Sequence, residues 1–95
     1  MSNYELCLVV NAKVEDDVRN ASLEDAKKLI TRFGGEIKNI DEWGKRRLAY
    51  EIDKNVEGYY YFIQFDAETT APAEIEDRLR TRDNVLRFLC TTIEA

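Results

Sequence analysis

Histidine is absent from this chain of 95 residues, and cysteine, proline and glycine are few. The two cysteines, Cys7 and Cys90, do not have the spacing of a metal site, and no histidine is available to activate either thiol. Acidic residues are plentiful, but neighbouring pairs such as Asp16 and Asp17 are typical of solvated helix faces. The sequence therefore indicates neither an enzyme nor a metal site, and we expect no cofactor and no small-molecule substrate.

A long apolar run and an excess of positive charge are also missing. No stretch approaches the length of a membrane span, and the N-terminus lacks the basic and then apolar pattern of a secretory signal, so we expect a cytosolic location without membrane contact. Fourteen basic residues stand against nineteen acidic ones, which gives a formal net charge of −5. Because nucleic-acid affinity depends on cations that neutralise phosphates, RNA binding would need clustered cations or a basic partner.

The length predicts one domain, residues 1–95, with a single hydrophobic core. Alternating apolar residues predict strands at 4–11, 36–53, 59–66 and 85–93, separated by a turn at 53–58 and by two helices, at 15–33 and from 68 to about 82. Gly34 and Gly35 suit the end of the first helix, and Pro72 is tolerated in the first turn of the second. This order predicts an α+β fold, the ferredoxin-like βαββαβ sandwich, with a four-stranded antiparallel sheet and two helices on one face.

Half of the cations lie in two short segments. One follows Gly44, where we expect the long second strand to bend, and the other surrounds the end of the second helix. An acidic chain can produce a local positive field in this way. The candidate RNA contacts are Lys45, Arg46, Arg47, Arg80, Arg82 and Arg87. The alternative is that these cations protect an edge strand from unwanted pairing and complement the dipole at the helix end.

Adjacent residues of a regular strand point to opposite faces. Arg46 and Arg47 can therefore both reach phosphate only if the strand bends away near Gly44 or lies at an edge of the sheet. Further along the same strand the alternation puts Leu48 and Tyr50 on one face, and we expect Leu48 to be a core residue.

The aromatic segment 57–65 has a partial likeness to the base-stacking motif of RNA recognition domains. Tyr59 and Tyr61 share a side with Ile63, however, so we interpret them as core residues and not as base-stacking ones. The opposite, helix-free side should carry an apolar patch with Val9, and Trp43 is either an interface anchor or a core residue. The candidate partner contacts are Trp43, Tyr60, Phe62 and Leu89. The alternative is a sheet that tolerates a few surface aromatics.

The same alternation puts Cys7 on the helix-free face and Cys90 in the core, which excludes a disulfide between them.

Three motifs occur in order: GKRRLAYEI at 44–52, EGY at 57–59 and RTRDNVLR at 80–87. Together with Tyr4, Glu5 and Asn11 they resemble the bacterial small-subunit ribosomal protein six family over nearly the whole chain. The resemblance implies a non-catalytic ribosomal protein that binds the central domain of small-subunit ribosomal RNA together with the strongly basic small-subunit ribosomal protein eighteen. It favours both the RNA contacts and the partner patch.

A second hypothesis is a small ferredoxin-like regulatory module that oligomerises through its sheet and binds a small ligand. A glycine-rich ligand loop would favour it. Gly34 and Gly35 are the only candidates, and they fit a helix end better.

Overall fold

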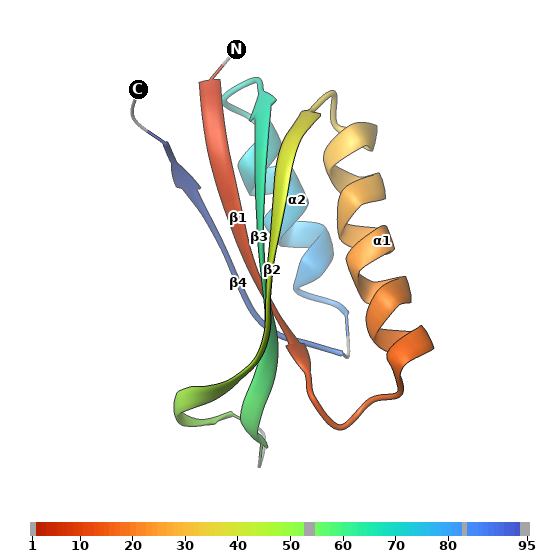
Figure 1. Ribbon diagram of the computed structural model, residues 1–95. Helices are drawn as coiled ribbons and strands as arrows, with labels where there is room; N and C mark the ends of the chain where they lie inside the picture. Colours follow the sequence, from red (N-terminus) through yellow and green to blue (C-terminus); the bar gives the residue numbers. More distant parts are fainter. Residues whose placement is uncertain (1, 53–54, 83, 94–95) are drawn as a thin grey trace.

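The computed structural model describes residues 2–52, 55–82 and 84–93. The elements follow as β1 (Ser2–Asn11), α1 (Asp16–Arg32), β2 (Glu36–Ile52), β3 (Asn55–Ala67), α2 (Ala71–Leu79) and β4 (Val85–Thr92). The strands form one antiparallel sheet in the order β2-β3-β1-β4, and both helices lie on the same side of it (Figure 1). The predicted ferredoxin-like fold is confirmed, with β2 and β4 at the two edges.

The core lies between the helices and the central strands. Every second residue of β1 and β3 faces the helices, as the alternation predicts. The buried residues are Tyr4, Leu6, Leu8, Val10, Tyr61, Ile63, Phe65 and Ala67 of the sheet, with Leu23, Ala26, Leu29 and Ile30 of α1 and Ala71, Ile75 and Leu79 of α2. Tyr59 packs partly buried against this core, with the Arg19 guanidinium 4.0 Å from its ring centroid. Tyr59 and Tyr61 are therefore packing residues.

Apolar residues spaced by three and four predict an inner stripe of α1, and the structure differs from it at Ala21; the predicted residues are Val18, Ala21, Ala26, Leu29, Ile30 and Phe33. Ala21 is exposed, and Leu23 is buried in its place. A helix turns once every 3.6 residues, so the stripe through Ala26 and Ile30 passes through Leu23 and misses Ala21.

Two glycines end α1. Gly34 has a φ of +83°, a conformation that side-chain-bearing residues rarely adopt. A Cβ on Gly35 would lie 2.7 Å from the Ile30 Cγ2 and 2.8 Å from the Ile30 carbonyl oxygen, and the Gly35 amide donates to that oxygen at 2.8 Å. These residues therefore close the helix, as the sequence predicts.

The distal part of the β2–β3 hairpin, residues 44–52 and 55–58, extends beyond the helices and curls toward the open face of the sheet (Figure 1). We call it the arm. It begins at Gly44, where φ is +80° and the β2–β3 register shifts, which confirms the predicted bend. The predicted turn is too long: β3 already starts at Asn55, and residues 53 and 54 lie outside the described part of the chain.

After the register shift at Gly44, Leu48 faces the open side of the sheet together with Arg46, two residues earlier, and its Cδ2 lies 3.6 Å from the position that a Cβ on Gly58 would take. Leu48 is only half buried and lies outside the buried core, so the expectation of a core residue is wrong. Tyr50 is 60% exposed. The arm instead approaches β1: a Cβ on Gly58 would lie 2.5 Å from the Val9 Cγ1. Val9 is only 1% exposed, so it does not contribute to the surface patch that the sequence predicts.

Candidate nucleic-acid interface

The helix-free side of the sheet, the open face, carries its side chains in cross-strand rows. One row joins Phe62 of β3, Cys7 of β1 and Leu89 of β4. The next row joins Tyr60, the buried Val9 and Arg87 on the same three strands. A hollow of about 180 Å³ lies between these rows, lined by Cys7, Val9, Tyr60, Arg87, Phe88 and Leu89. The predicted partner residues Tyr60, Phe62 and Leu89 are thus brought onto one largely apolar surface.

Trp43 lies at the β2 side of this face. Its ring centroid is 4.7 Å from that of Phe62, at an interplanar angle of 53°, and its Nε1 donates to the Asp41 carboxylate at 2.9 Å. The side chain is 50% exposed, so Trp43 is a surface residue and not a core one. It sits at the register shift that begins the arm, next to the first basic cluster.

Lys45, Arg46 and Arg47 are all exposed on the edge strand. Lys45 pairs with Tyr59, whose ring packs on the core side, whereas Arg46 pairs with Gly58 and approaches the Trp43 ring on the open side. From the sequence, Arg46 and Arg47 can both reach phosphate only with a bend near Gly44 or an edge position. The structure has both features. Among the described residues no ion pair engages these three cations.

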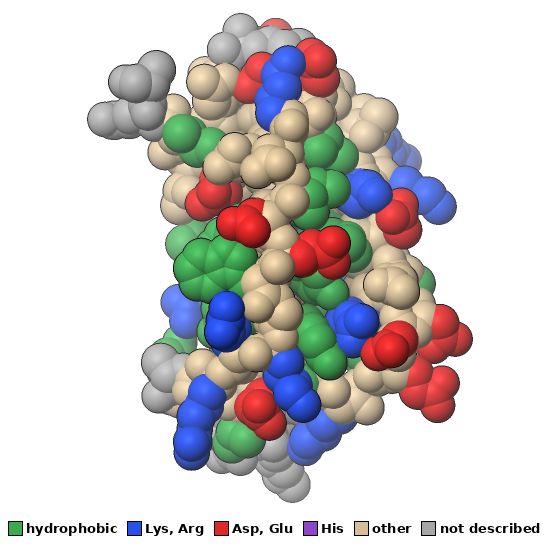
Figure 2. Space-filling model, in the orientation of Figure 1, with side chains coloured by type: hydrophobic (Ala, Val, Ile, Leu, Met, Phe, Trp, Pro, Cys, Tyr) green, Lys and Arg blue, Asp and Glu red, His purple; other side chains and the backbone are tan. Residues whose placement is uncertain are grey.

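Five other cations of the described chain behave differently. Arg19, Lys27, Lys38, Arg80 and Arg82 each have a carboxylate within ion-pair distance. Figure 2 shows several Lys and Arg side chains at the lower end of the molecule, where Figure 1 places the arm, and others at the top and the upper right beside acidic side chains. Among the described residues, the arm therefore presents three consecutive exposed cations without an ion-pair partner.

Arg87 is connected to the arm by Tyr50. The Arg87 Nη1 donates to the Tyr50 hydroxyl at 2.8 Å, and its guanidinium lies 5.8 Å from the ring centroid. This contact joins β4, at one edge of the sheet, to the end of β2, which forms the other edge. The sequence did not single out Tyr50 as a functional residue, because the strand alternation assigned it to the same face as Leu48.

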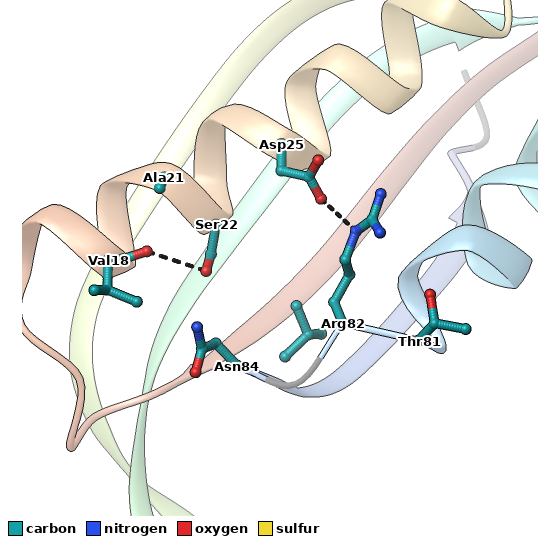
Figure 3. Close-up of a pocket in the computed structure, with 8 residues that line it drawn as sticks. Val18, Ala21, Ser22, Asp25, Thr81, Arg82 and Asn84 are labelled. Atoms are coloured by element: carbon teal, nitrogen blue, oxygen red, sulfur yellow. Dashed lines mark hydrogen bonds and ion pairs between the residues drawn. The ribbon is translucent and has the colours of Figure 1, made fainter.

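Arg80 and Arg82 lie away from that surface. Arg82 reaches across a hollow of about 480 Å³ on the helix side, and its Nε donates to the Asp25 carboxylate of α1 at 2.6 Å (Figure 3). Arg80 lies 3.5 Å from the Asp77 carboxylate one turn earlier. The structure thus brings Arg87 to the arm and separates Arg80 and Arg82 from it.

The two cysteines lie on opposite sides of the sheet, as the alternation predicts. Both are free: Cys7 lines the open-face hollow, and Cys90 packs against the core. The Cys90 amide, on the outer edge of β4, donates to the Glu76 carboxylate at 3.0 Å. Burial, together with this carboxylate, raises the pKa of the Cys90 thiol to about 12. Burial also raises the pKa of the Cys7 thiol, assisted by the charge of Glu5.

Within residues 2–52, 55–82 and 84–93 no three acidic or cysteine side chains are grouped to hold a metal ion. None of the described helices has the length and apolar character to cross a membrane.

The chain can now be compared with known proteins. A profile of the ribosomal protein S6 family matches residues 3–92. The small ribosomal subunit protein bS6 of Clostridium acetobutylicum is 38% identical over 94 residues, 99% of each chain. That of Caldanaerobacter subterraneus subsp. tengcongensis is 43% identical over 89 residues, 94% of each chain.

Among solved structures, the crystal structure of 30S ribosomal protein S6 from Thermotoga maritima matches with a TM-score of 0.91 and 28% identity, covering 97% of this chain and 87% of that one. The sequence motifs, the fold and these matches agree with one another. The chain therefore belongs to the ribosomal protein S6 family, and it is a structural, non-enzymatic component of the small ribosomal subunit in the cytoplasm.

Proposed function

We propose that this chain binds the central domain of small-subunit ribosomal RNA together with the basic small-subunit ribosomal protein eighteen. One observation carries the proposal: in a chain of net charge −5, the arm presents three cations that no described carboxylate neutralises. Phosphate contacts of this kind supply most of the sequence-independent affinity for RNA.

Lys45, Arg46, Arg47 and Arg87 form the main RNA-binding surface in this proposal. Lys45 and Arg46 leave the edge strand on opposite sides, so the arm can contact phosphates on both of its faces. Glu57 lies opposite Arg47 in the pairing of β2 with β3, and its negative charge lowers the positive potential at that position. Arg80 and Arg82 contribute a second, weaker contact, because each has to leave an exposed carboxylate partner to reach RNA.

The apolar rows of the open face are the surface for the partner protein. Leu89 is 50% exposed beside the hollow, and Phe62 and Tyr60 border it on β3. Burying such a contiguous apolar patch favours association. A strongly basic partner also supplies the cations that this chain lacks, so the two proteins together present more positive charge to the RNA than this chain does alone.

A filter-binding assay tests the proposal with a central-domain RNA fragment at physiological salt. We expect weak binding by this chain alone and a large gain when protein eighteen is added. Leu89→Glu should reduce that gain, because it puts a charge into the apolar contact. Ala21→Glu, which adds the same charge at an exposed site of α1, is the matched control and should keep it. Tight binding by the isolated chain, or no gain with the partner, refutes the proposal.

A further inference from the structure

Two exposed aromatic side chains of β2 each lie beside a guanidinium group. Trp43 is 50% exposed, with the Arg46 guanidinium 5.9 Å from its ring centroid. Tyr50 is 60% exposed, with the Arg87 guanidinium at 5.8 Å. Both distances are near the outer limit of a cation–π contact, about 6 Å, so the rings and the cations are near each other without tight stacking.

The polar atoms of both rings already have partners within the chain. The Trp43 indole N–H donates to Asp41, and the Tyr50 hydroxyl accepts from Arg87. Phe62 packs against Trp43 and holds the indole in place. What remains to offer a ligand is the aromatic surface of both rings and the O–H donor of Tyr50, with a cation beside each ring. The segment between the two rings adds Lys45 and Arg47.

We propose that Trp43 and Tyr50 stack on unpaired nucleobases of the RNA while Arg46 and Arg87 contact the adjoining phosphates. Single-stranded RNA combines flat bases with regularly spaced negative charge, which is the pattern this strip complements. A base-paired helix is a poorer fit, because its bases are stacked on one another. The inference rests on the proposed RNA role, and it assigns Trp43 to RNA where the sequence suggested a protein partner.

The charge distribution favours RNA over the partner protein at this strip. The apolar partner surface lies around the hollow between β3, β1 and β4, whereas the Trp43 ring has the Arg46 guanidinium beside it, with Lys45 and Arg47 next to Arg46 in the strand. A strongly basic partner is repelled by these cations. RNA phosphates are attracted by them, and the Asp41 carboxylate, which accepts the indole N–H but keeps its negative charge, offsets only part of this attraction.

Trp43 is the only tryptophan of the chain, so 5-fluorotryptophan labelling yields a single fluorine NMR resonance from this site. The labelled chain is mixed with unlabelled protein eighteen, and then with a central-domain RNA fragment that contains unpaired nucleotides. We expect the resonance to move mainly at the RNA step. A fully paired RNA of equal length and inorganic polyphosphate should move it little. A resonance that moves at the protein step and not at the RNA step, or that responds equally to polyphosphate, overturns the inference.

Variants give a second readout in the partner-assisted RNA complex. Trp43→Leu keeps an apolar side chain but removes the aromatic surface, and we expect a loss of affinity of roughly 5- to 150-fold, the range for one stacked base. Tyr50→Leu should act in the same direction, and Trp43→Phe should retain most of the affinity. Val56→Ala, at an exposed site of the arm without an aromatic ring, is the control.

The two proposals fail in different ways. Wild-type affinity for Trp43→Leu in a complex that binds RNA well refutes the stacking alone. A wild-type complex that does not bind the RNA refutes the proposed function itself. Thermal midpoints of all variants identify any loss that comes from unfolding.

Discussion

Replacing Arg46 and Arg47 together by alanine tests whether the arm is made for binding or for folding. Both side chains are exposed, and no described carboxylate pairs with either. Within the described part of the chain, the contact at stake is that of Arg46 with the Trp43 ring at 5.9 Å, and exposed contacts of this kind contribute about 0.5–1 kcal/mol. We therefore expect the free energy of unfolding to fall by less than about 1 kcal/mol, which lowers the thermal midpoint by less than about 4–8 °C in a domain of this size.

The effect on RNA binding should be larger and should depend on salt. Each lost phosphate contact lowers the slope of log affinity against log salt by roughly 0.7–0.9, so two contacts lower it by roughly 1.4–1.8. The loss should be similar for RNAs of different sequence, since phosphates carry no sequence information. Titrations of the partner-assisted complex at several salt concentrations measure both quantities.

A matched control separates local contact from net charge. Lys28 and Arg32 are also exposed, no described carboxylate pairs with them, and they lie on α1, on the helix side of the sheet. Replacing both by alanine removes the same two charges but should leave the salt slope nearly unchanged. An equal loss in both double variants would mean that only total charge matters. An arm variant that binds normally but unfolds early would show that residues 44–52 are structural.

Three further predictions follow from the contacts around the core and the helix side. Ile63→Ala removes most of a fully buried side chain and should lower the free energy of unfolding, measured by chemical denaturation, by about 2–5 kcal/mol. A loss below about 1 kcal/mol would contradict the described core. The Cys90 thiol should stay protonated and resist alkylation up to pH 9, and Glu76→Gln should lower its pKa and speed the reaction, because the carboxylate is the second cause of the raised pKa. A double-mutant cycle between Arg82 and Asp25 should give a coupling of about 0.2–1 kcal/mol, as for other exposed pairs, and zero coupling would show that the contact does not hold the turn to α1.

The raised pKa of Cys90 also sets the direction of a pH effect. The Cys90 thiol ionises less readily in the folded chain than in the unfolded one, where its pKa is near 9. Its contribution to the free energy of unfolding is therefore fully present below pH 9. That contribution is lost as the pH rises from 9 toward 12. Cys90→Ala should therefore flatten the fall in stability over this alkaline range.

Patterns within a few neighbouring residues were sufficient to predict most of the fold. Side chains alternate along β1 and β3, so Leu6, Leu8 and Ile63 could be assigned to the core from spacing alone. Glycine is the residue that adopts positive φ at little cost, and Gly34 and Gly44 accordingly mark the helix end and the bend of β2. The order of strands and helices then left few topologies to consider.

What the sequence could not decide was contact between segments distant in the chain. The alternation predicts an exposed Val9, yet the close approach of Gly58 buries it. It predicts Leu48 in the core, yet the register shift at Gly44 turns Leu48 to the helix-free side. The alternation also could not show that Tyr50 meets Arg87 or that Asp25 holds Arg82. Strand and helix periodicity act within a few residues, so the sequence by itself determined the elements, their order and their inner faces. The tertiary structure alone decided which cations of the described chain form ion pairs, because a pair such as Arg82 and Asp25 joins residues that only folding brings together.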